Sequence, residues 1–131
     1  MELTDIRNSK FYSIVSDIVA AGAKDVWWQD NSLPPHIAEL LGDQENIRFS
    51  YNNKQFDIFC NNRSEQIEIV MVQEHSVTDV FAFQTSLKDL QDPKEQKDML
   101  YWIMHYREPQ WFKVMHERLE LHPSWNSYEM L

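Results

Sequence analysis

The spacing of apolar residues in this 131-residue chain changes from a helical repeat to a strand repeat and back again. Phe11, Ile14 and Ile18 recur at intervals of three and four, which is one face of an amphipathic helix. From Ile47 onward apolar and polar residues alternate, and a period of two is typical of half-buried strands. The helical repeat returns after Asp92. Separate blocks of the two repeats predict an α+β fold.

The predicted architecture is a four-stranded antiparallel sheet, arranged as a meander and flanked by N-terminal and C-terminal helices. The segment from Val26 to Leu33 is predicted to be a polar loop. Ile67 to Val72 is apolar on both faces, so helices from both ends of the chain are expected to cover the sheet. Asp92, Pro93 and Glu95 form a strong helix start. We expect a single domain over 1–131, with helices over about 4–22, 34–41, 93–107 and 110–121, strands over about 47–51, 55–61, 67–73 and 80–86, and a tail over 123–131.

Composition excludes several classes of function. The two glycines, Gly22 and Gly42, are too far apart for a dinucleotide-binding or P-loop motif. A formal charge of −9 disfavours a nucleic-acid reader, which needs a basic surface, and an anionic membrane surface as a partner. The single cysteine, Cys60, excludes an intramolecular disulfide and fits a reducing compartment. Without a secretory signal or a long apolar stretch, the chain is expected to be soluble and cytoplasmic.

No catalytic or metal-binding signature stands out, because the five histidines and one cysteine form neither an HExxH nor a CxxC motif. Cys60 could act as a nucleophile with His75 nearby, but a cysteine in an alternating strand is more often a small buried hydrophobe. Glu65 and Glu68 could serve as acid and base, although a solvated face explains them as well. The sequence therefore predicts no cofactor and no metal, with an enzyme as the least favoured alternative.

The negative charge is concentrated in two stretches that contain no lysine or arginine. The first runs between Lys24 and Arg48 and the second between Arg63 and Lys88. Together the two stretches account for the whole formal charge of −9. Uncompensated charge of this kind steers a basic partner, although ordinary solubility also needs net charge. The acidic residues of the two stretches are Asp25, Asp30, Glu39, Asp43 and Glu45, and then Glu65, Glu68, Glu74 and Asp79.

Two adjacent indoles, Trp27 and Trp28, lie in the first base-free stretch. Alternation allows at most one of them to point into the core. An exposed tryptophan with a polar rim is typical of a binding hot spot, whereas the alternative is that both indoles cover the edge of the sheet. The predicted partner-binding residues are Trp27, Trp28, Asp25, Asp30, Asp43, Glu45, Glu65, Glu68, Glu74 and Asp79.

The segment from Ser32 to Leu41, which reads SLPPHIAELL, resembles the Leu-Pro-led helix of the SUKH superfamily, many members of which are bacterial immunity proteins. The Asn-Gly-Gly that often follows in that superfamily is replaced here by Gly42-Asp43-Gln44. In its acidic, aromatic-rich and glycine-poor character the chain also resembles immunity proteins that present carboxylates to the basic groove of a nuclease toxin.

This resemblance implies a non-enzymatic inhibitor that binds a basic folded protein and occludes its active site, with no direct contact to nucleic acid or membrane. One alternative is a type III secretion chaperone, which would dimerise and bind an unfolded effector segment along apolar grooves. Another is a phage-type inhibitor that mimics DNA. The sequence leaves the oligomeric state and the partner's identity open.

Overall fold

A computed structural model describes residues 7–31, 36, 43–72 and 82–115. It confirms the α+β class, but the antiparallel sheet has five strands rather than the four predicted. The elements in chain order are α2 (Tyr12–Ala20), β1 (Lys24–Asn31), β2 (Gln44–Tyr51), β3 (Lys54–Asn61), β4 (Gln66–Met71), β5 (Phe83–Ser86), the 3₁₀ turn η2 (Asp89–Gln91), α4 (Pro93–Met104) and α5 (Trp111–Val114).

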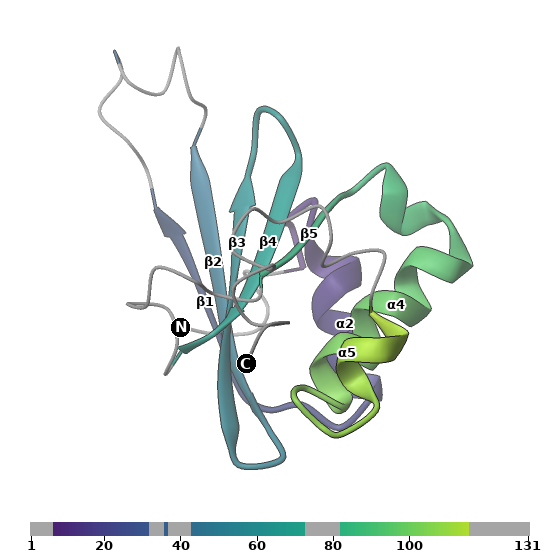
Figure 1. Ribbon diagram of the computed structural model, residues 1–131. Helices are drawn as coiled ribbons and strands as arrows, with labels where there is room; N and C mark the ends of the chain where they lie inside the picture. Colours follow the sequence, from purple (N-terminus) through teal and green to yellow (C-terminus); the bar gives the residue numbers. More distant parts are fainter. Residues whose placement is uncertain (1–6, 32–35, 37–42, 73–81, 116–131) are drawn as a thin grey trace.

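The sheet is a meander in which every strand pairs with its neighbour in sequence, in the order β1-β2-β3-β4-β5 (Figure 1). β2 and β3 form a tight hairpin in which Tyr51 lies opposite Lys54. The two loop residues, Asn52 and Asn53, have φ values of 51° and 63°. Two positive φ values in a two-residue loop define a type I′ turn, whose twist matches that of the strands. The predicted strand pair around this turn is confirmed.

Strand β1 is the main correction to the sequence prediction, which made Val26 to Leu33 a polar loop. Trp28 lies opposite Ile47 and packs, with Val26, against the core, whereas Trp27 on the other face is 39% exposed. The register shifts between Lys24 and Trp27, where Asp25 has a φ of 54°. This β-bulge inserts an extra residue, so the alternation that marks a strand is broken at its start.

The helix predicted from residue 4 begins only at Tyr12 in the described part of the chain. Residues 7–11 form turns, because the Ser9 hydroxyl accepts a hydrogen bond from the Phe11 amide at 3.0 Å and the Ser9 carbonyl accepts one from the Tyr12 amide. A serine that bonds to nearby backbone in this way competes with helix formation. The predicted helix over 34–41, apart from His36, and the tail over 123–131 lie outside the described residues.

The C-terminal helices are close to the prediction. The Asp92 side chain accepts a hydrogen bond from the Lys94 amide at 2.9 Å, which confirms the N-cap of α4. The helix ends at Met104 rather than at residue 107, since Arg107 has a φ of 58°, which no helix accommodates. In α5 the described helix covers Trp111–Val114, and the rest of the predicted range lies beyond the described residues.

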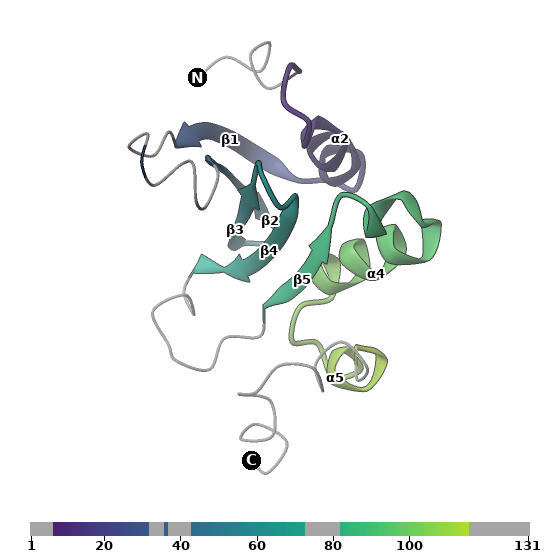
Figure 2. The same cartoon turned by 90° about the horizontal axis from the view of Figure 1, so that it is seen from above.

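All three described helices lie on the same side of the curved sheet, although helices from the two ends of the chain were expected to cover its two faces (Figures 1 and 2). Between the helices and the sheet lies one apolar core. On the opposite face of the sheet, Val70 is only 1% exposed, whereas Gln66 on the same face of β4 is exposed and Glu68 is partly exposed, so the predicted cover on both faces holds at Val70 alone. The largest fully buried side chains are Trp102, Trp111, Tyr106, Phe11, Phe49, Phe56, Phe83, Ile14 and Ile18.

Candidate functional site

Four of the predicted acidic residues meet at one end of the sheet. Asp30 near the end of β1 lies opposite Glu45 near the start of β2. The Asp43 carbonyl, just before β2, accepts a hydrogen bond from the Asn62 amide at 2.8 Å, which brings in the turn after β3. Glu65 closes that turn before β4 begins. We call Asp30, Asp43, Glu45 and Glu65 the acidic end, and it joins carboxylates from both base-free stretches.

Glu45 has a structural environment that the sequence did not indicate. It is only 5% exposed, and its Oε1 accepts hydrogen bonds from Trp28 Nε1 at 2.7 Å and from Ser9 Oγ at 2.5 Å. It points to the helix side of the sheet because it lies opposite Cys60, which is fully buried. A buried carboxylate needs such donors, since an unpaired charge in the interior is strongly unfavourable. Glu45 is therefore too buried for direct contact with another molecule.

Asp30, by contrast, is exposed. Partial burial raises the pKa of Asp30, and the charges of Glu45 and then Asp43 raise it further. No residue in the described ranges donates a hydrogen bond to its carboxylate. A cation or donor supplied from outside would relieve this repulsion.

Two basic residues lie at the acidic end, Lys10 and Arg63, the latter in the turn that Glu65 closes. Lys10 Nζ donates to the Asn62 carbonyl at 2.9 Å and approaches Glu65 Oε2 at 3.4 Å. Both side chains of this pair are nearly half exposed, so the ion pair contributes little to stability. Lys10 therefore partly neutralises the charge of Glu65, but it does not pair with Asp30.

The other predicted carboxylates lie elsewhere. Asp25 sits in the bulge at the opposite end of β1. Glu68 lies on the sheet face away from the helices, where its Oε2 accepts a hydrogen bond from Gln84 Nε2 at 3.3 Å. Glu74 and Asp79 lie outside the described residues. The structure therefore brings together four of the eight predicted carboxylates, and it separates Asp25 from them.

The two adjacent indoles point to opposite faces of the sheet, which confirms that at most one reaches the core. Trp27 lies opposite Arg48 on the face away from the helices. Arg48 makes a bidentate pair with Asp57, in which Nε–Oδ1 is 2.7 Å and Nη2–Oδ2 is 3.0 Å. The hydrogen bond to Asp57, followed by its charge, raises the pKa of Arg48. Sequence reasoning missed this pair, although an arginine and an aspartate on the same face of one hairpin were a usable signal.

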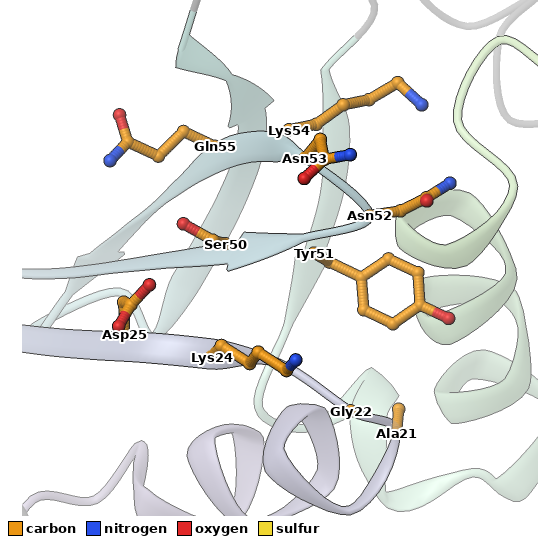
Figure 3. Close-up of a pocket in the computed structure, with 10 residues that line it drawn as sticks. All are labelled: Ala21, Gly22, Lys24, Asp25, Ser50, Tyr51, Asn52, Asn53, Lys54 and Gln55. Carbon is orange, nitrogen blue, oxygen red and sulfur yellow. The ribbon is translucent and has the colours of Figure 1, made fainter.

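A pocket of about 770 Å³ lies at the opposite end of the sheet from the acidic end. Figure 3 shows the Lys24 side chain and the Tyr51 ring extending toward the same side, whereas Gln55 extends away from them. Its lining offers one carboxylate, that of Asp25, and no histidine or cysteine. The lining residues are Ala21, Gly22, Lys24, Asp25, Ser50, Tyr51, Asn52, Asn53, Lys54 and Gln55.

The cysteine considered as a nucleophile is inaccessible. Cys60 is fully buried, and burial, together with the charge of Glu45, strongly raises the pKa of its thiol. A thiol becomes reactive only when its pKa is lowered, so this environment suits a core residue. His75 lies outside the described residues. Within the described ranges, no three histidine, cysteine, aspartate or glutamate residues are grouped so that they could hold a metal ion.

No protein-family model, curated protein or solved structure matches the chain. In the part of the chain that the structure describes, no helix is long and apolar enough to cross a membrane.

Proposed function

We propose that this protein is a non-enzymatic inhibitor that binds a basic folded protein through the acidic end, in the manner of an immunity protein that neutralises a nuclease toxin. The observation that carries the proposal is the convergence of Asp30, Asp43 and Glu65. These residues come from both base-free stretches, and the pairing of β1 with β2 and of β2 with β3 places them at one end of the sheet.

Such an arrangement favours a basic partner for two reasons. The carboxylates create a negative potential that speeds encounter with a positively charged surface. Asp30 also lacks a donor among the described residues and is repelled by its acidic neighbours, so a lysine or arginine from a partner would stabilise its charge. A nuclease presents such a surface where it binds nucleic acid, and occupying that surface would block its substrate.

Trp27 supplies a second element of the interface. It is 39% exposed and lies on the same strand as Asp30, three residues earlier. Its neighbour Arg48 is held by a buried carboxylate, which gives the indole a rigid polar surround. A rigid aromatic beside an arginine is the composition most enriched at interface hot spots.

The test uses two triple charge reversals of equal net charge. One variant replaces Asp30, Asp43 and Glu65 with lysine, and the control replaces Asp17 of α2, Asp98 of α4 and Glu108 of the turn between α4 and α5. Partners are first captured from a lysate of the source organism on the immobilised parent protein. The affinity of the main captured protein for each variant is then measured by calorimetry at low and at high salt.

The first triple variant should bind at least about 100-fold more weakly than the parent, and the control should stay within about fivefold. Equal binding by the two variants would refute the charge-based interface. The captured protein should also be a nuclease that the parent inhibits in a cleavage assay, and an uninhibited partner would refute the immunity function.

A further inference from the structure

β1 is an edge strand, and the hydrogen-bond pattern of the sheet shows which of its backbone groups face outward. In an antiparallel pair, residues that are hydrogen-bonded to the neighbouring strand alternate with residues that are not. Tyr51 and Lys54 form the hydrogen-bonded pair that closes the two-residue hairpin. At the other end of the same two strands, the Asn62 amide donates to the Asp43 carbonyl, which fits the same alternation. Odd-numbered residues of β2 therefore bond to β3, and even-numbered residues bond to β1. Within β1, Trp28 lies opposite Ile47, an odd-numbered residue of β2.

It follows that the amide and carbonyl groups of Trp28 and Asp30 point away from the sheet. No backbone group in the described ranges bonds to them. Figure 2 shows β1 at one edge of the sheet, with α2 as the nearest described helix. The edge strand at the other side, β5, has only four residues against eight in β1. Among the described residues, β1 therefore offers the longer row of unpaired backbone groups.

The side chains beside this edge select what can pair with it. Asp30 is exposed next to it, and Asp43 and Glu45 lie close enough to repel the Asp30 charge. A second copy of this chain would bring its own acidic end and its charge of −9 to the same place. Charged side chains and a bulge at an edge are devices that oppose pairing between identical molecules. A strand that carries lysine or arginine is complementary in charge to Asp30 and its acidic neighbours, whereas the β1 strand of a second copy is not.

We propose that β1 binds an extended basic segment of the protein partner as a sixth strand of the sheet, with a lysine or arginine of that segment opposite Asp30. This inference rests on the proposed function, and it adds the mode of binding. Backbone hydrogen bonds to Trp28 and Asp30 provide the pairing, and side chains provide the selection.

The geometry also defines the sequence of that segment. Asp30 points to the helix side of the sheet and Trp27 to the other side, since they lie opposite Glu45 and Arg48. Residues that face each other across paired strands point to the same side. The partner's basic residue and an apolar residue that covers the Trp27 indole should thus lie three positions apart.

The first experiment measures amide hydrogen exchange in ¹⁵N-labelled protein, alone and in complex with the captured basic partner. Strand addition should slow exchange at the amides of Trp28 and Asp30 by about 100-fold or more, and it should leave the amides of β5 unchanged. Unchanged exchange at both β1 amides in a saturated complex would overturn the inference. It would leave the proposed function intact if the charge-reversed variant still fails to bind.

A pair of variants separates backbone pairing from charge. Asp30→Ala removes the carboxylate and keeps the amide, whereas Asp30→Pro removes both. Proline is tolerated on an edge strand where its nitrogen faces outward. Asp30→Pro should bind the partner about tenfold more weakly than Asp30→Ala, because one backbone hydrogen bond is lost as well.

Equal affinities of these two variants would contradict strand addition. Circular dichroism and the urea midpoint establish that each variant is folded. If Asp30→Pro does not fold, amide exchange in the parent protein alone and in complex decides between strand addition and binding through side chains only.

Discussion

Replacing Arg48 should destabilise the protein far more than neutralising its partner Asp57, although the two residues share the same pair of hydrogen bonds. The Asp57 side chain is 4% exposed and that of Arg48 is 44% exposed. In Arg48→Met the aspartate keeps its charge in a buried place and loses bonds of 2.7 and 3.0 Å. An unpaired buried charge costs about 3–5 kcal/mol, and we expect about 3 kcal/mol because water reaches the arginine side of the pair.

The reciprocal change leaves a guanidinium that water can hydrate. Asp57→Asn keeps the shape of the side chain and one acceptor oxygen, so we expect a loss of about 1 kcal/mol in the free energy of unfolding. The double variant Arg48→Met/Asp57→Val removes both charges and places a β-branched residue beside Val70, its neighbour in β4. It should be within about 1 kcal/mol of the parent, since apolar pairs commonly replace buried ion pairs without loss.

The measurement is urea unfolding at neutral pH, followed by the fluorescence of the five tryptophans. An unchanged dependence on urea concentration would show that the variants unfold from the same compact state. Equal losses for Arg48→Met and Asp57→Asn would refute the asymmetry. A double variant whose loss equals the sum of the two single losses would refute the argument that the unpaired charge is the cause.

Three further substitutions test other parts of the structure. Trp111→Phe should lower the free energy of unfolding in urea by about 1 kcal/mol more than Trp102→Phe. Trp111 Nε1 donates to the Trp102 carbonyl at 3.2 Å, whereas Trp102 Nε1 has no partner in the described chain. Equal losses in the two variants would contradict this. Asp25→Gly should raise the free energy of unfolding by about 0.5 kcal/mol and Asp25→Ala should lower it, since the φ of 54° at this position favours glycine. Chemical denaturation of both variants tests which of the two is the more stable. Asp30→Asn should be more stable than the parent at neutral pH, because burial and then neighbouring carboxylates raise the pKa of Asp30 and disfavour its ionised form in the folded state. That advantage should vanish as the pH falls below about 4, where the carboxyl is protonated in both states, and a difference that is constant with pH would count against it.

Four strands and the start of α4 could be predicted from the sequence because a local residue pattern marks each of them. Alternation marks β2 and β3, and an acid followed by proline marks the helix at Asp92. β1 was missed for a physical reason, since the bulge at Asp25 shifts the register and a tryptophan stands on each face of the strand. The predicted start of the first helix was too early. The apolar repeat begins only at Phe11, and it is preceded by the Ser9 turn, which depends on a side-chain bond to the Phe11 amide.

The candidate site was predictable in its residue types and not in its geometry. Uneven charge pointed to the two acidic stretches, and Asp30, Asp43 and Glu65 do lie at one end of the sheet. The burial of Glu45 depends on donors that are 17 and 36 residues away in sequence, which no local pattern reveals. The outward-facing backbone of β1 was equally hidden, because the segment was assigned to a loop.

The meander order of the sheet has a consequence for how the chain folds. Each strand pairs with the strand next to it in sequence, so the sheet can extend outward from the Asn52–Asn53 turn through a series of short loop closures. The helices precede and follow the sheet in sequence, so we expect the helical layer to pack onto the sheet after the strands have paired. We therefore expect destabilising substitutions at Ile47 or Ile58 to slow refolding in stopped-flow measurements, whereas equal destabilisation at Ile14 of α2 should accelerate unfolding instead. The opposite result, in which the Ile14 variant refolds more slowly and the Ile47 or Ile58 variant unfolds faster, would show that the helices form before the hairpin.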